Sequence, residues 1–314
     1  MDILRKRRRT DARSRGSALT IAVTAALAVM AISMLAACSA ASSGGQALPR
    51  PGTTGTGTRT GDASVLRLRS PVWLLTRSAL SKLISDPTVR DELQGSQIYE
   101  ILQPGQQPLP GVTAEPVVTF ASSTALQDAI SSGQLPASTF GVLYDPEAWS
   151  FTPVTEQRDP VLAATRAAAV AHAHGLHLIV SPALNLTTIL KPGSQEPRWR
   201  QFLSLNLAGR LARIADFVEL QAQSLEQDTA TYTAFVQAAT SQASAANPRI
   251  SVLAGLSTNP PGAPVDSEDL TAAVQATRSM VDGYWLNIPG QGARCLTCEA
   301  SRPDIAIQFL QALY

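Results

Sequence analysis

A repeat of short apolar runs separated by longer helical patterns most constrains the fold of this chain. The runs are rich in Val, Ile, Leu and aromatic residues and are bounded by Pro, Gly, Asn or Ser, which is typical of strands. The last five runs are centred about 36 residues apart on average, the length of one strand plus one helix. The clearest predicted strands are Ile98–Leu102, Val117–Ala121, Gly141–Asp145, His177–Ser181, Phe217–Gln221, Ser251–Leu256 and Tyr284–Ile288.

Helices are predicted between these runs. Asp159 precedes Pro160, so a favoured N-cap residue is followed by a favoured first-turn residue, and the helix that they open ends at Gly175. The other predicted helices are Ser78–Leu83, Trp199–Ala215, Thr229–Ala246, Ser267–Val281 and Pro303–Leu313.

Strands that alternate with helices in this way form a parallel sheet covered on both faces. Seven or eight units in about 250 residues predict a (β/α)8 TIM-like barrel that occupies residues 65–314 as a single domain. Val72–Thr76 is either the remaining strand or the lead-in to the first helix. A doubly wound open sheet is the alternative, but it normally has a glycine-rich first turn, which is not evident in the sequence.

The N-terminus has the pattern of an export signal. The basic cluster 5–9 is followed by an uncharged apolar run, Ser17–Ala37. The sequence LAAC, which ends at Cys38, resembles the bacterial lipobox, in which the cysteine carries the lipid. We therefore predict a signal peptide at residues 1–37 and a lipid anchor at Cys38, with an uncleaved transmembrane anchor as the alternative. Either anchor places the protein at the cell membrane, on its extracytoplasmic face.

Composition narrows the choice of partners. Residues 38–64 are rich in Gly, Ser and Thr and have almost no large apolar side chain, so they are predicted to form a flexible linker. The chain has 25 basic and 24 acidic residues, and seven of the basic ones lie in residues 1–37. The remainder is mildly acidic, which argues against a nucleic-acid partner. We expect a monomer.

The histidines are predicted to lie away from any catalytic centre. In a (β/α)8 barrel the chemistry is found at the carboxyl ends of the strands. His172 and His174 end a helix and His177 begins a strand, so all three belong to the opposite end of the barrel. We therefore expect no metal, no cofactor and no Ser-His-Asp triad.

Strand alternation points instead to carboxylates and amides at the carboxyl ends. In the run 141–147, Asp145 and Glu147 share one face of the strand. In the run 217–223, Glu219, Gln221 and Gln223 share a face, and the residues between them are apolar. Burying these long polar side chains is costly unless they line a polar pocket. Asp145, Glu147 and Glu219 are therefore the candidate catalytic residues.

Three further residues suit a sugar site. Trp285 and Asn287 share a face of the last strand and offer a flat apolar surface beside an amide, and Asn185 follows the strand His177–Ser181. Together with Gln221 and Gln223, these residues are predicted to bind substrate. Glycosidic cleavage needs an acid and a second carboxylate, and amides bind sugar hydroxyls.

The sequence GVLYDPE at residues 141–147 resembles the end of the DGxDxDxE strand of the barrel-fold chitinases. The glycine and the final Asp-x-Glu match, whereas Phe140 and Leu143 replace the earlier aspartates. The resemblance implies that Glu147 is the acid that protonates the leaving oxygen and that Asp145 orients the acetamido group of the substrate. It also implies that Trp285 forms the floor of the site. The segment 144–160 is also similar to actinobacterial secreted lipoproteins of unassigned function with barrel-like folds.

These patterns favour a membrane-anchored glycoside hydrolase that acts on cell-wall or environmental glycans. A barrel that binds a carbohydrate or envelope component without cleaving it is the alternative. A solute receptor would fit the lipid anchor but not the even repeat. The alternative to a functional role for these carboxylates is a structural one. In that case Asp145 and Glu147 cap loop backbone, and Glu156 pairs with Arg158.

Cys295 and Cys298 form a CxxC motif in a glycine-rich loop after the last predicted strand. Outside the cytoplasm such a pair more often forms a disulfide than a zinc site, which would need two further ligands. We predict a disulfide between the two cysteines.

Overall fold

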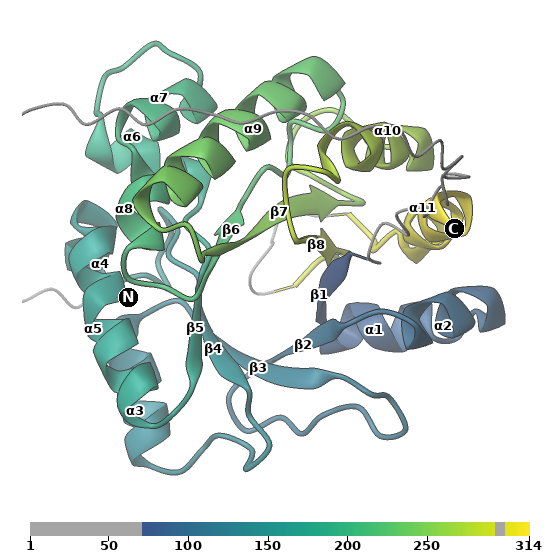
Figure 1. Ribbon diagram of the computed structural model, residues 1–314, viewed down its shortest axis with the longest axis horizontal. Coiled ribbons are helices and arrows are strands. Elements are labelled where there is room, and N and C mark those ends of the chain that lie inside the picture. The colour runs from purple at the N-terminus through teal and green to yellow at the C-terminus, as the bar shows by residue number, and fades with distance from the viewer. Residues whose placement is uncertain (1–70, 293–298) are drawn as a thin grey trace, which may run out of the picture. The chain divides into compact units, whose positions relative to one another are not determined.

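Eight parallel strands close into a barrel in the computed structural model, which describes residues 71–292 and 299–314 (Figure 1). Each strand pairs with the next along the chain, and β8 pairs with β1. The predicted (β/α)8 barrel is confirmed, and Val72–Thr76 is its first strand. The strands are β1 Val72–Thr76, β2 Ile98–Leu102, β3 Glu115–Phe120, β4 Gly141–Tyr144, β5 His177–Val180, β6 Phe217–Leu220, β7 Ser251–Ser257 and β8 Gly283–Asn287.

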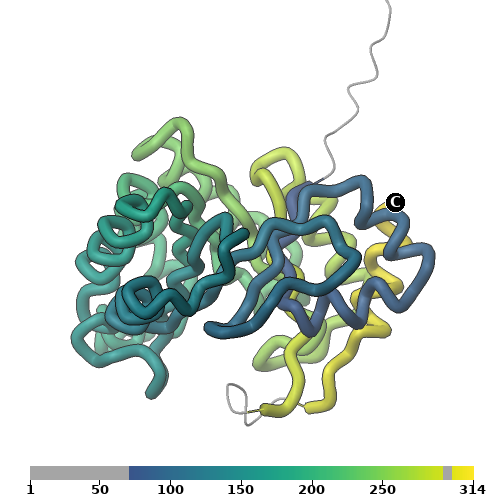
Figure 2. Tube along the Cα trace, turned by 90° about the horizontal axis from the view of Figure 1, so that it is seen from below, coloured from purple at the N-terminus to yellow at the C-terminus, as the bar shows by residue number. Residues whose placement is uncertain are grey.

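The helices cover the outer face of the sheet. In Figures 1 and 2 the last helix, α11, lies beside α1 and α2, and the indole Nε1 of Trp73 in β1 donates a 3.1 Å hydrogen bond to the hydroxyl of Tyr314 after α11. The helices are α1 Arg77–Leu83, α2 Pro87–Gln94, α3 Ser123–Ser131, α4 Val154–Arg158, α5 Pro160–Ala173, α6 Thr187–Leu190, α7 Arg198–Ser204, α8 Leu207–Ala212, α9 Thr229–Ala246, α10 Ser267–Thr277 and α11 Pro303–Leu313, with a 3-10 turn, η1, at Leu184–Leu186.

Two predicted helices are wrong in their extent. The predicted helix Trp199–Ala215 is two helices, α7 and α8, which are separated at Asn206, whose φ is 49°. Asn tolerates this left-handed conformation better than most residues. The break brings Gly209 against α9, where a Cβ would lie 2.9 Å from the carbonyl oxygen of Gln242. The helix predicted at Ser267–Val281 also ends early, at Thr277.

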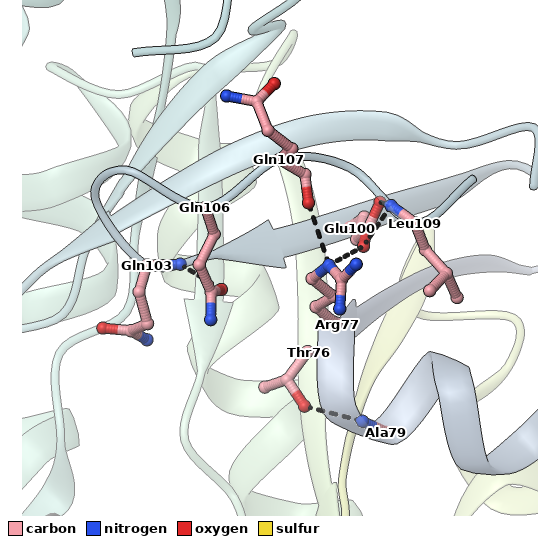
Figure 3. A network of polar contacts seen from close by, with 8 residues as sticks. All are labelled: Thr76, Arg77, Ala79, Glu100, Gln103, Gln106, Gln107 and Leu109. Carbon is pink, nitrogen blue, oxygen red and sulfur yellow. Dashed lines mark hydrogen bonds and ion pairs between the residues drawn. The ribbon is translucent and has the colours of Figure 1, made fainter. Parts of the chain in front are cut away.

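The connection between β2 and β3, residues 103–114, contains no helix. Glu100 of β2 points outward, where a helix would otherwise pack, and it is 1% exposed. Both of its carboxylate oxygens lie 3.0 Å from the backbone nitrogen of Leu109, which donates to them (Figure 3). Burial raises the pKa of Glu100. This buried carboxylate therefore anchors the loop that replaces a helix.

Aromatic rings fill the amino end of the barrel. The ring of Phe140 stacks on Tyr99 at 4.9 Å and on His177 at 4.4 Å, and Phe217 meets Tyr99 edge-on at 5.5 Å. These rings close the end of the barrel opposite the predicted site. His172 lies at the same end, because its Nε2 is 2.9 Å from Oδ2 of Asp216, which immediately precedes β6. The predicted placement of the histidines is confirmed.

Several predictions fall outside the described residues. They are the signal peptide at 1–37, the lipid anchor at Cys38, the linker at 38–64 and the disulfide between Cys295 and Cys298. These remain predictions. Within the part of the chain that the structure describes, no helix has both the length and the apolar character needed to cross a membrane.

Candidate active site

Asp145, Ser181 and Glu219 lie side by side at the carboxyl ends of three adjacent strands. The backbone nitrogen of Ser181 donates to the carbonyl of Tyr144, and the register of β5 with β6 pairs the residues that precede Ser181 and Glu219. Tyr144, Val180 and Val218, which immediately precede these three residues, belong to the outer core between the sheet and the helices. Successive side chains along a strand point to opposite faces, so Asp145, Ser181 and Glu219 face the barrel interior. The inward orientation predicted for Asp145 and Glu219 is therefore confirmed.

A chain of hydrogen bonds joins these three residues through Gln221. The hydroxyl of Ser181 donates to Oε2 of Glu219 at 2.6 Å. Nε2 of Gln221 donates to Oδ1 of Asp145 at 2.7 Å, and it lies 3.1 Å from both the carbonyl and the hydroxyl oxygen of Ser181. Gln221 thus reaches from β6 across β5 to the end of β4. We refer to Asp145, Gln221, Ser181 and Glu219 as the β4–β6 polar chain.

Glu219 is the innermost member of this chain and is fully buried. Burial raises its pKa to about 8; the hydrogen bond from Ser181 acts in the opposite direction, and the charge of Asp145 adds to the rise. Its Oε1 has no hydrogen-bond partner among the described residues. A buried, unpartnered oxygen is consistent with a protonated carboxyl group at neutral pH. The hydrogen bonds that lead from Glu219 toward the mouth of the barrel pass through Ser181 to Gln221.

Glu147 lies farther out, in the loop after β4, and is half-buried. Asn185, in η1 after β5, donates from Nδ2 to Oε2 of Glu147 at 3.3 Å, and its Oδ1 accepts from the backbone nitrogen of Ala148 at 2.8 Å. The backbone nitrogen of Glu147 donates to the hydroxyl of Thr152 at 3.1 Å. Two predicted site residues, Glu147 and Asn185, are thus in direct contact.

The same loop presents an aromatic surface that the sequence analysis did not single out. Thr152 is 1% exposed, and its hydroxyl also accepts from the indole nitrogen of Trp149 at 2.9 Å. Phe151 packs edge-on against Trp149, with ring centroids 5.0 Å apart, yet it is 48% exposed. One buried hydroxyl therefore fixes both the Glu147 backbone and the Trp149 ring. The signal in the sequence is an aromatic pair in the loop that follows a predicted site carboxylate.

The remaining predicted binding residues lie toward β7 and β8. The amide of Gln223 covers Gly255 of β7, where a Cβ would be 2.6 Å from Cδ of Gln223. Trp285 is 7% exposed and belongs to the apolar cluster inside the barrel, and its Nε1 has no hydrogen-bond partner among the described residues. Asn287 is half-buried at the end of β8, and its carbonyl accepts from the nitrogen of Thr258.

Glu226 is a buried carboxylate that sequence reasoning missed. Its Oε1 accepts from the backbone nitrogen of Ser257 at 2.8 Å, at the end of β7. Burial raises its pKa to about 7, against the opposing effect of backbone N–H groups in its own loop. Ser224, two residues earlier, has a φ of 80°. Apolar periodicity does not report loop geometry of this kind, so no sequence signal marks Glu226.

The expected pairing of Glu156 with Arg158 is wrong. Glu156 is buried, and its carboxylate accepts from the hydroxyl of Ser122 at 3.1 Å and from the nitrogen and hydroxyl of Ser123 at 2.9 Å and 3.0 Å. The hydroxyl of Tyr144 donates to it at 2.9 Å. Glu156 joins α4 to the start of α3 and to β4, which is a structural role.

In residues 71–292 and 299–314, no group of three or more His, Cys, Asp or Glu side chains is arranged to hold a metal ion. The side chains at the β4–β6 end carry carboxylates, amides, hydroxyls and aromatic rings. This combination can bind sugar hydroxyls and exchange protons with a glycosidic oxygen.

Comparisons with known proteins add no chemistry. No protein-family model matches the chain, and no curated protein matches it. Among solved structures, a proposed α-L-fucosidase from Bacteroides thetaiotaomicron is similar, with 10% identity, a TM-score of 0.49, and coverage of 83% of this chain and 99% of that one.

Two further solved structures show the same level of likeness. A chitinase from Chromobacterium violaceum has 13% identity and a TM-score of 0.42, with coverage of 78% of this chain and 98% of that one. A triosephosphate isomerase from Bartonella henselae has 12% identity and a TM-score of 0.40, with coverage of 69% and 91%. These values carry no argument about activity, so the assignment of function depends on the site itself.

Proposed function

We propose that the chain is a membrane-anchored extracytoplasmic glycoside hydrolase, with its lipid anchor at Cys38 and its active site at the carboxyl ends of β4–β6. Glu147 is the acid that gives a proton to the glycosidic oxygen, and Asp145 is the second carboxylate. The substrate class is a cell-wall or environmental glycan.

The observation that carries this proposal is the β4–β6 polar chain beside Glu147. Asp145 is buried to 6% exposure, and Gln221 holds it at a hydrogen-bond distance of 2.7 Å. Burying a carboxylate is costly, and a purely structural role would not require a second acid, Glu219, beneath it. A positioned carboxylate that reacts with or orients a substrate is the simplest use of this arrangement.

The Trp149–Phe151 pair supports a carbohydrate as the ligand. Phe151 is 48% exposed but is held by a ring contact to Trp149, which is in turn held by Thr152. An aromatic ring that is both rigid and exposed loses little entropy when a flat apolar face of a sugar packs on it. This surface adjoins the loop residue Glu147.

One observation favours the second candidate, a carbohydrate-binding barrel without catalysis. Asn185 donates a hydrogen bond to the Glu147 carboxylate, whereas a general acid must itself hold a proton there. Glu219, whose pKa is raised, is fully buried beneath Ser181. In a binding barrel the same carboxylates would accept hydrogen bonds from sugar hydroxyls.

The test uses the full-length protein in detergent. Binding is screened on a glycan array, and each glycan that binds is incubated with the protein and analysed for products. Glu147→Gln is compared with Glu196→Gln, a matched change at an exposed carboxylate that pairs with Lys191. Cleavage that Glu147→Gln abolishes and Glu196→Gln leaves intact supports the hydrolase. Binding without cleavage by the unaltered protein supports the binding barrel.

A further inference from the structure

A polar pocket of about 390 Å³ lies at the carboxyl ends of β1 and β2, away from the β4–β6 polar chain. Two cationic residues of α1, Arg77 and Lys82, line it, together with the hydroxyl-bearing residues Thr76, Ser78 and Ser81. Its volume falls within the range of about 300 to 1,000 Å³ that small-molecule sites occupy. The pocket is therefore large enough for a ligand of monosaccharide size.

The lining has the chemistry of an anion site. Besides the residues of α1 and Thr76, it includes the amide side chains of Gln103 and Gln106 and the apolar Ile101, and it includes no acidic residue. The two cations outnumber the single neighbouring carboxylate, that of Glu100 beside Arg77, and this excess of positive charge favours an anionic ligand. Hydroxyl and amide groups suit the hydroxyls of a sugar.

Arg77 is held in place from one side. Its Nε donates to the carbonyl of Gln107 at 2.8 Å and lies 3.8 Å from Oε1 of Glu100 (Figure 3). Its terminal amino groups have no hydrogen-bond partner among the described residues, and its side chain is 36% exposed. Glu100 is itself fixed by the backbone nitrogen of Leu109. The guanidinium is thus oriented in advance, with two donors available for a bidentate bond to an oxyanion.

Lys82 supplies the second charge from the last turn of α1. Its Nζ donates to the hydroxyl of Ser301 at 2.9 Å, a neutral partner, and it forms no ion pair with a carboxylate of the described residues. Arg77 opens the same helix, so α1 carries one cation at each end of the segment that lines the pocket.

We propose that this pocket binds a sugar-sized polyhydroxy compound that carries one carboxylate or phosphate group. Arg77 binds the oxyanion, Lys82 adds positive charge to the lining, and the hydroxyl and amide side chains bind the hydroxyl groups. The proposal goes beyond the hydrolase activity, because no residue of the β4–β6 polar chain takes part in it.

The experiment is calorimetric titration of the full-length protein in detergent with glucuronate, glucose 6-phosphate and glucose. At least one of the two acids is expected to bind at least tenfold more tightly than glucose, and raising the salt concentration should weaken that binding. A preference for glucuronate identifies a carboxylate ligand, and a preference for glucose 6-phosphate identifies a phosphate ligand.

Two variants and one control test the assigned residues. Arg77→Gln should lower the affinity for the preferred acid at least tenfold, and Lys82→Gln should lower it severalfold. Arg166→Gln, which removes the same charge from an exposed position on α5, should leave it unchanged. Arg77 also contacts the β2–β3 loop, so thermal unfolding of each variant is measured. Lys82 donates only to Ser301 among the described residues, so its variant keeps the test decisive if Arg77→Gln fails to fold.

The proposal is overturned if both acids bind no more tightly than glucose, or if Lys82→Gln and a folded Arg77→Gln behave like Arg166→Gln. Its failure is distinct from that of the hydrolase proposal. Glu147→Gln should retain the binding of the acid, since Glu147 does not line this pocket. Loss of cleavage with intact acid binding would leave this inference standing.

Discussion

Gln221 donates a 2.7 Å hydrogen bond to Asp145 across the whole width of β5, although the two residues are 76 positions apart in the chain. The bond ties the ends of β4 and β6 to each other. Below it, Ser181 and Glu219 complete a polar column inside a barrel whose other end is closed by aromatic rings. The position of Asp145 at the mouth therefore depends on Gln221 and, through Gln221, on Ser181.

The raised pKa of Glu219 predicts how stability changes with pH. The folded state keeps a proton on Glu219 up to about pH 8, whereas an unfolded chain releases it near the ordinary pKa of about 4.5. The free energy of unfolding should therefore fall as pH rises from about 5 to about 8, and Glu226, with a pKa of about 7, adds to the fall. Urea unfolding at several pH values measures this slope.

The matched variants for that measurement are Glu219→Gln and Glu196→Gln. Glu219→Gln should reduce the slope, because an amide cannot release a proton, and each unit of pKa shift corresponds to about 1.4 kcal/mol. Glu196→Gln should not alter it. A stability that rises with pH over this interval, or an unchanged slope in Glu219→Gln, would contradict the assignment of a buried neutral acid.

Two glycines of the barrel should respond differently to the same substitution. In Gly283→Ala, the new Cβ meets the backbone carbonyl of Val72, where β8 closes on β1 and the chain cannot yield. The free energy of unfolding should fall by about 3 kcal/mol or more.

In Gly255→Ala, the three atoms nearest to the new Cβ all belong to the end of the Gln223 side chain, which can rotate away. The loss of stability should be smaller, about 1 kcal/mol, and the binding of glycans should weaken because Gln223 is displaced. Denaturant unfolding of both variants compares the two effects. Equal destabilisation would show that the Gln223 amide is as immobile as backbone.

Cys38→Ala should prevent lipidation. We expect the variant to leave the membrane fraction or to accumulate as an unprocessed precursor, because the LAAC sequence offers no other cysteine. Fractionation and intact mass measure this. Membrane retention with an unaltered mass would indicate an uncleaved anchor instead.

Cys295 and Cys298 should be oxidised to each other in the exported protein. A thiol assay on denatured, unreduced protein should detect neither, and two free thiols would refute the pairing. The bond closes a very short loop, so its effect on stability should be well below the roughly 2–4 kcal/mol of a typical bridge.

The barrel could be predicted because each strand is a short apolar run with a regular spacing. Strand alternation also placed Asp145 and Glu219 toward the interior correctly, since a one-residue shift would have put an apolar residue there. The break at Asn206 could not be predicted, because apolar periodicity continues through it. It lies at the left-handed residue Asn206, whose side chain fills the space beside Gly209.

The partners within the site were less accessible to sequence reasoning. Ser181 links Glu219 to Gln221 only because the register of β5 places it between them. Glu226 reaches Ser257 through a loop with a left-handed residue, and Glu156 reaches α3 across the fold. Contacts between residues far apart in sequence have no local signature, whereas strands and helix caps do.

The central claim is that Glu147 is the acid of a glycan-cleaving site. The most direct measurement is the rate of product release from a glycan that the full-length protein binds, compared between the unaltered protein and Glu147→Gln. The account predicts unchanged binding and a rate lowered by at least about a hundredfold in Glu147→Gln, the lower end of what a general acid contributes. A Glu147→Gln variant that cleaves the glycan at the unaltered rate would contradict it.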